Sequence, residues 1–171
     1  MIVELLKIIL PSVFVFLAGY LAIERLLREE TKRRKAELNQ SNQKITIPIR
    51  LQAYERMVLF LERISPESLL VRVNQPNISV KKFQTQLLQN IRAEWEHNLS
   101  QQLYVSNKSW ELVKNAKANV IKLISTCSDK LPPDAPGIML SQKVLETVVE
   151  LENHPTSFAI DFLKKEVNDI F

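Results

Sequence analysis

Glycine is nearly absent from this chain of 171 residues, which holds only Gly19 and Gly137. A Walker phosphate loop and a dinucleotide-binding fingerprint each need glycines a few residues apart, so both motifs are excluded. Turn-rich sandwiches and barrels also rely on glycine at their turns, and its shortage therefore favours a mostly helical fold. The length corresponds to about one domain.

Cysteine occurs once, at Cys127, and histidine twice, at His97 and His154. A single cysteine excludes a disulfide within one chain, and the Val, Ile and Leu residues around it predict a buried thiol. The chain offers few candidates for a general base, and it contains no nucleophile-elbow motif. We therefore expect a non-catalytic protein without a cofactor.

The longest stretch without charge is Ile8–Ile23, which ends abruptly at Glu24. As a helix it would measure about 24 Å, somewhat less than the ~30 Å hydrocarbon core, and Lys7 can snorkel outward to extend it. These features predict a transmembrane anchor over residues 1–24. A cleavable signal peptide fits less well, because the first residues carry no net positive side-chain charge and Tyr20 occupies the −3 position of the cleavage site. A buried soluble helix is the third alternative.

A basic block follows the apolar run and holds six cations against three glutamates between residues 24 and 35. The cations are Arg25, Arg28, Lys32, Arg33, Arg34 and Lys35. The positive-inside rule then predicts the N-terminus outside and the remaining chain in the cytoplasm, with the block lying against anionic lipid headgroups. The block supplies most of the +4 net charge of the chain. Because the rest is nearly neutral, we expect no binding to nucleic acid.

Residues 25–47 are expected to form a charged helix, then a hinge at NQSNQK and a short extended ITIP segment. Residues 48–171 contain about five amphipathic helices by apolar spacing, one of them beginning after a Ser79 cap. The first core stripe is predicted at Ile47, Leu51, Tyr54, Val58 and Leu61. Leu69–Val73 could be a helix or a short strand. The sequence thus predicts an all-α fold, with a transmembrane helix followed by a cytoplasmic helical bundle.

The best metal-binding pattern pairs Glu94 with His97, the Glu-x-x-His spacing of ferritin-like di-iron sites. Such a site needs a second copy, whereas His154 has no glutamate three residues before it. The helical phase also turns His97 away from the apolar stripe, which favours an exposed histidine over a metal ligand. A metal-dependent enzyme that uses Glu94 and His97 is therefore only an alternative function. Trp95 and Trp110 lie on apolar stripes and are predicted to be core residues.

Two stretches, IPIRLQAYERMVLFLERI and EWEHNLSQQLYVS, resemble a family of small uncharacterised proteins from Bacteroidota. Residues Tyr54–Arg56 and Trp95–Asn98 carry the likeness, which extends over residues 45–127. In that family a single N-terminal membrane helix precedes a cytoplasmic helical domain of unknown function. The resemblance implies a single-pass protein of the bacterial inner membrane and brings no activity or site residue.

The expected function is therefore that of a membrane-anchored interaction or accessory subunit of an inner-membrane assembly. Its expected partners are the lipid bilayer and either another protein or a second copy of the chain. The second alternative, besides the metal-dependent enzyme, is an exported helical protein that begins near residue 24 after signal cleavage.

Overall fold

The computed structural model describes the backbone of residues 2–151 and 154–170, and their side chains except those of residues 2–15, 18, 36, 39, 41, 42 and 170. The chain divides into two compact units, Met1–Ile47 and Pro48–Phe171. Within the described ranges all regular elements are helices, and these ranges contain no β-strand, only an isolated bridge between Ser79 and Pro136. The predicted all-α class is thus confirmed.

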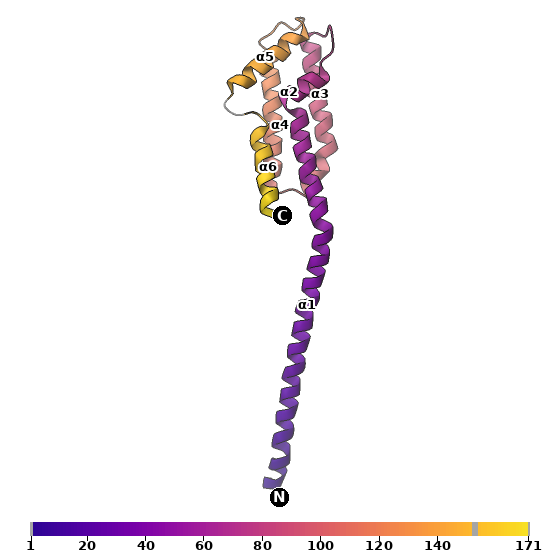
Figure 1. The fold of residues 1–171 in the computed structure, drawn as a ribbon, viewed down its shortest axis with the longest axis vertical. Coiled ribbons are helices and arrows are strands. Elements are labelled where there is room, and N and C mark those ends of the chain that lie inside the picture. The colour runs from indigo at the N-terminus through magenta and orange to yellow at the C-terminus, as the bar shows by residue number, and fades with distance from the viewer. Residues whose placement is uncertain (1, 152–153, 171) are drawn as a thin grey trace. The chain divides into compact units, whose positions relative to one another are not determined.

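Seven helices follow one another along the described residues, and Figure 1 labels α1 to α6 among them. They are α1 (Ile2–Ile64), α2 (Pro66–Val73), α3 (Val80–Asn98), the 3-10 helix η1 (Leu99–Leu103), α4 (Asn107–Ser128), α5 (Gly137–Glu150) and α6 (Ser157–Ile170). The ambiguous segment Leu69–Val73 belongs to α2 and is therefore helical. The cap predicted at Ser79 is confirmed, because its hydroxyl accepts a hydrogen bond from the first turn of α3.

The break expected between residues 39 and 47 is wrong, because α1 continues through NQSNQK, ITIP and Pro48. Asn and Gln are only modestly poorer helix formers than leucine, so polar composition alone does not end a helix. Extending an existing helix also costs far less than starting a new one. A proline inside a helix costs about 3 kcal/mol, through its missing N–H and the crowding of its ring against the preceding turn, yet α1 continues through Pro48. Cooperativity therefore outweighs the local signals for a hinge.

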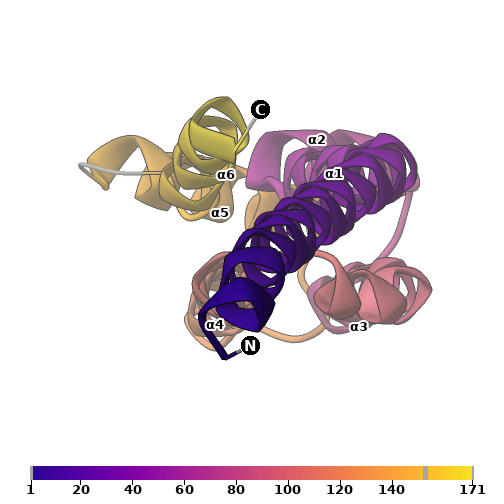
Figure 2. The ribbon, with the colours of Figure 1, turned by 90° about the horizontal axis from the view of Figure 1, so that it is seen from below.

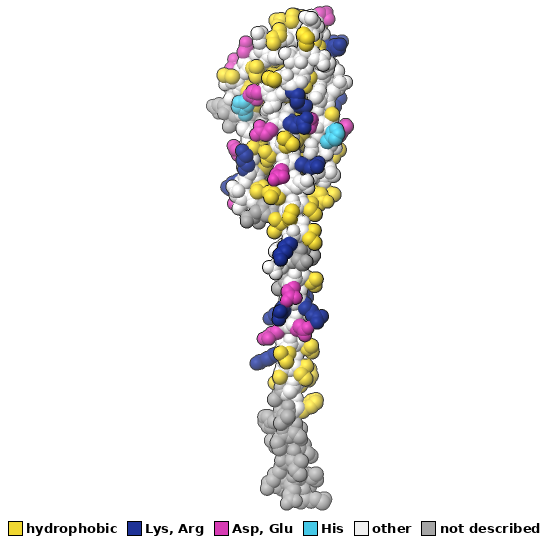
Figure 3. Space-filling model, turned by 45° about the vertical axis from the view of Figure 1, so that its right-hand side comes forward, with side chains coloured by type: hydrophobic (Ala, Val, Ile, Leu, Met, Phe, Trp, Pro, Cys, Tyr) yellow, Lys and Arg dark blue, Asp and Glu magenta, His cyan; other side chains and the backbone are white. Residues whose placement is uncertain are grey.

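The first unit passes from apolar to charged side chains along its described surface (Figure 3). Exposed apolar residues such as Phe16, Tyr20 and Ile23 come first, and the basic block follows. Within this block, Arg28 and Arg34 pair with glutamates one turn earlier. Among the residues that the structure describes, no helix is both long and apolar enough to span a membrane. Most side chains of the anchor predicted at residues 1–24 lie outside the described set.

The second unit has a single apolar core to which all of its α-helices contribute. Helix α3 packs against α4 and α5, while α6 packs against α4 and α2 lies against α3 and α5 (Figures 1 and 2). The largest fully buried side chains are Tyr54, Phe60, Phe83, Met57, Leu61, Ile64, Leu69, Leu87, Ile91, Ile124, Leu140 and Leu163. Cys127 is buried as predicted, with its Sγ 3.5 Å from the hydroxyl of Thr147.

The proline-rich loop between α4 and α5 covers the N-terminal end of α3. The backbone N–H groups of Val80 and Lys81 donate to the carbonyl oxygens of Ala135 and Pro133, at 2.9 and 3.1 Å. The first N–H groups of a helix have no partner within the helix, so these bonds satisfy donors that would otherwise need water. The loop thereby fixes the start of α5 against the start of α3.

Candidate functional site

An apolar groove of about 540 Å³ lies between residues 51–62 of α1 and the second half of α6. Tyr54 and Leu163, both fully buried, are its deepest residues. Val58 and Val167 are partly buried and line the walls. The volume falls within the range of roughly 300–1,000 Å³ found for ligand sites, and grooves of this kind also receive the apolar face of a helix.

The groove exists because the apolar stripe of α1 is wider than the surface that α6 covers. Leu51, Tyr54 and Val58 follow helical spacing and share one face of α1. Tyr54 is buried, yet Leu51 is 37% exposed, and Leu59 on the neighbouring edge is 56% exposed. Helix α6 packs on α4, and its Leu163 and Val167 line the groove opposite this stripe. The predicted core positions of Ile47 and Leu51 are therefore wrong, because both side chains are exposed.

Charged side chains stand on both sides of the groove. Glu55 and Glu62 lie on the α1 side, and Lys164 lies on the α6 side. Among the described residues, none of the three takes part in an ion pair. Such free charges orient a charged partner but contribute little binding energy by themselves.

A chain of hydrogen bonds holds the walls of the groove together at one end. The hydroxyl of Tyr54 accepts a bond from the N–H of Ser106 at 3.3 Å. The side chain of Ser106 caps α4 by accepting from the N–H of Ser109 at 3.1 Å, and the hydroxyl of Ser109 donates to Glu166 on α6. These bonds connect α1, α4 and α6, so the groove is a built feature of the fold rather than a gap between independent helices.

Glu94 and His97, the predicted metal candidates, lie on α3 but serve other contacts. The Glu94 carboxylate is only 18% exposed and accepts from Arg63 at 2.9 Å and from Arg72 at 3.4 Å. His97 is exposed, and its Nδ1 lies 2.7 Å from the carbonyl oxygen of Ala93. The described residues contain no cluster of three or more metal-binding side chains. Glu94 thus acts as the centre of an ion-pair network that ties α1, α2 and α3 together.

Trp95 and Trp110 stack on each other rather than forming an open platform. Their ring centroids are 4.6 Å apart at an angle of 25°, and Phe60 lies 5.5 Å from Trp95. Both tryptophans are partly buried and pack on the core, which confirms their prediction as core residues. The Nζ of Lys117 lies 3.9 Å from the Trp95 centroid. Burial, helped by the charge of Lys114, lowers the pKa of Lys117.

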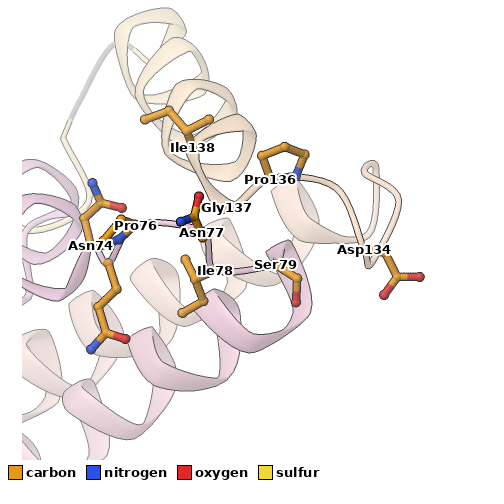
Figure 4. Close-up of a pocket in the computed structure, with 10 residues that line it drawn as sticks. Asn74, Pro76, Asn77, Ile78, Ser79, Asp134, Pro136, Gly137 and Ile138 are labelled. Atoms are coloured by element: carbon orange, nitrogen blue, oxygen red, sulfur yellow. The ribbon is translucent and has the colours of Figure 1, made fainter.

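A second depression, of about 470 Å³, lies where the loop 74–79 meets the start of α5 (Figure 4). The N–H of Gly137 donates to the carbonyl of Ile78 at 2.7 Å, and Asn77 has a left-handed backbone with φ of 60°. Any Cβ at Gly137 would lie 2.8 Å from Cγ2 of Ile78. Asp134 is the only acidic or basic residue among those that line this depression. The short distances at Gly137 indicate tight packing between the loop 74–79 and the start of α5 rather than a binding site.

Comparison with known proteins identifies a family for almost the entire chain. Residues 1–170 match the family described as "Family of unknown function (DUF7935)". Comparison with curated proteins and with solved structures finds no match for this chain. The resemblance to an uncharacterised family is confirmed, whereas the Bacteroidota origin and the single membrane span stay predictions. With its match covering nearly the full length, the chain belongs to the DUF7935 family of unknown function.

Proposed function

We propose that this protein is a membrane-anchored, non-catalytic interaction subunit whose second unit binds a helix of a partner protein. The observation that carries this proposal is the apolar groove between α1 and α6. Leu51 and Leu59 keep more than a third of their surface exposed at its edge, next to the buried Tyr54 and Leu163. A docked helix would remove this surface from water, at about 25 cal/mol per Å² of apolar area.

A helix is the partner that best fits an apolar groove between two helices. Amphipathic helices enter such grooves with side chains spaced three, four and seven residues apart. The acidic side chains of Glu55 and Glu62 face one edge of a docked helix, and Lys164 faces the other. A partner helix with basic residues along one edge and an acidic residue along the other would therefore bind in one preferred direction.

The proposed location is the bacterial inner membrane, with the N-terminus outside and the second unit in the cytoplasm. The support comes from the sequence, in which the uncharged run Ile8–Ile23 is followed by six cations. Mass spectrometry of the native N-terminus separates this proposal from export, because an anchored protein keeps its first residues. A mature chain that begins near residue 24 would contradict the anchor.

Site-specific photo-crosslinking in cells tests the groove. A photoreactive phenylalanine analogue in place of Lys164 should give one discrete adduct, and the same analogue in place of Val71 should not. Val71 is a suitable control because it is 83% exposed on α2 and does not line the groove. Mass spectrometry of the adduct then identifies either another protein or a second copy of this chain.

A disrupting variant makes the crosslinking test specific. Leu51→Asp adds a charge to the groove wall at a partly exposed position, so the adduct from position 164 should fall at least about tenfold. Val71→Asp should leave it unchanged. A monodisperse monomer that gives no adduct from position 164, or an adduct that survives Leu51→Asp, would refute the proposed helix-binding role.

The topology is tested separately by removing the basic block. Replacement of its six cations by glutamine should produce mixed orientation, because the rest of the chain has almost no net charge to act as a second signal. A reporter that is active only in the cytoplasm, fused after Phe171, should then lose signal. If the variant keeps its full reporter signal, the block does not set the orientation.

A further inference from the structure

We propose that the depression between α1 and α3 binds a small molecule that carries one carboxylate or phosphate group next to an apolar or aromatic moiety. This depression measures about 470 Å³. Its lining residues are Arg56, Leu59, Phe60, Arg63, Glu94, His97 and Asn98. It is distinct from the helix-binding groove, although Leu59 borders both.

Positive charge exceeds negative charge around this depression. Arg56 and Arg63 are seven residues apart on α1 and therefore lie on the same face, two turns from each other. Arg63 shares the carboxylate of Glu94 with Arg72, which comes from α2. Arg56 has no ion-pair partner among the described residues. Two guanidinium groups thus share the Glu94 carboxylate, while Arg56 lines the same depression, and an anion bound next to Arg56 would offset part of the excess positive charge.

The hydrogen-bond donors of the three arginines are used unequally. Arg72 donates through one terminal nitrogen to Glu94 and through the other to the carbonyl oxygen of Arg63. Arg63 contacts Glu94 through one terminal nitrogen, and the ion pairs of the described residues do not include Arg56. Each guanidinium carries five N–H groups in a planar fork that matches the oxygens of carboxylate and phosphate. Arg56 and Arg63 therefore keep donors for a ligand, while Arg72 holds the network in place.

Apolar surface next to the arginines suggests the rest of the ligand. Phe60 is 1% exposed and tilts against Trp95, so it gives a rigid wall. Leu59 is 56% exposed at the edge of the same depression. A ligand with a ring or short chain beside its anionic group would cover Leu59 and contact Phe60. Glu94 disfavours a second negative group nearby, and the site therefore favours a single anionic group over a polyanion.

Ligand-detected NMR titrations of the full chain in a mild non-ionic detergent test this site. The three probes are phenyl phosphate, inorganic phosphate and benzyl alcohol, which present both features, the charge alone and the ring alone. Phenyl phosphate should show saturable binding and the lowest Kd of the three. Arg56→Gln should raise its Kd about tenfold, because a charge-assisted hydrogen bond is lost. Arg92→Gln, an exposed arginine on α3 outside the depression, should leave the Kd unchanged.

Arg56 is the position of choice because its replacement leaves the contacts of Glu94 with Arg63 and Arg72 intact. Tryptophan fluorescence of each variant confirms that the second unit is folded before titration. The proposal is overturned if phenyl phosphate does not saturate at millimolar concentrations, or if benzyl alcohol binds equally well. It is also overturned if Arg56→Gln and Arg92→Gln weaken binding to the same extent. None of these results depends on the groove, so they neither support nor contradict the proposal that the groove binds a helix.

Discussion

Replacement of Gly137 by alanine tests how closely the start of α5 approaches the loop before α3. The added Cβ would lie 2.8 Å from Cγ2 of Ile78, 3.0 Å from its carbonyl oxygen and 3.3 Å from the Cβ of Phe83. The same carbonyl accepts the N–H of Gly137 at 2.7 Å. A backbone oxygen held by a hydrogen bond cannot rotate away, so the new methyl group must push α5 off the loop or strain that bond.

Two opposing effects set the size of the change. Alanine restricts the unfolded chain and so stabilises by about 0.4–1 kcal/mol where the site accepts it without strain. Forcing an extra carbon into a well-packed site costs about 1–3 kcal/mol. The 2.8 Å approach is far below the ~3.5 Å at which carbon atoms attract each other, which places the cost in the upper part of that range. We expect a net loss of about 1–2 kcal/mol in the free energy of unfolding.

Urea unfolding of the full chain in mild detergent, followed by tryptophan fluorescence, measures this loss. Both tryptophans lie in the second unit, so the signal reports the unit that contains Gly137. Gly19→Ala is the matched control, because nothing lies within 4 Å of the Cβ it would add. The control should leave the urea midpoint unchanged. A Gly137→Ala protein that is as stable as the wild type would refute the tight approach.

Two further substitutions use the same unfolding assay. Glu94→Gln should lower the free energy of unfolding by about 1–2 kcal/mol, because two arginines lose their shared charged acceptor, whereas exposed Glu96→Gln should change it by less than about 0.5 kcal/mol. Equal effects of the two would contradict the proposed network. Because the pKa of Lys117 is lowered by burial and by Lys114, the unfolded state binds this proton more tightly. The wild type should therefore gain stability relative to Lys117→Met as the pH rises from neutral to about 10.5, and a constant difference would contradict the shift.

Most helices of the second unit could be predicted because their signals are local. Apolar spacing located α3 to α6, and the hydroxyl of Ser79 marked the start of α3. Helix α2 begins at Pro66, and proline fits the first turn of a helix because the N–H it lacks has no partner there. The burial of Cys127 followed from its apolar neighbours. Each inference needed only residues within a few positions of one another.

The features that sequence reasoning missed depend on contacts between distant residues. The groove forms where residues 51–62 of α1 meet the second half of α6, which no local pattern specifies. The ion-pair network joins residues from three helices, Arg63, Arg72 and Glu94, so local sequence patterns could not predict it either. The prediction of a break in α1 failed for another reason. The polar residues that indicate a hinge also lie in a helix that is already formed, and extending that helix is favourable.

Leu59 shows why exposure alone does not identify a functional surface. Val71 and Val149 are 83% and 85% exposed, more than Leu59, yet single apolar residues on a surface are ordinary because over half of a protein's accessible surface is apolar. Leu59 differs because it borders both the apolar groove and the arginine-lined depression. Leu59→Asp should therefore weaken both the crosslink from position 164 and the binding of phenyl phosphate.

The two sites can still be separated, because each has residues that the other lacks. Leu51 lines only the groove and Arg56 lines only the depression. If both sites are real and independent, Leu51→Asp removes the crosslink and spares phenyl phosphate, and Arg56→Gln does the reverse. If instead each variant abolishes both signals while its tryptophan fluorescence stays native, the two surfaces are not separate sites, and the assignment of one partner to each is wrong.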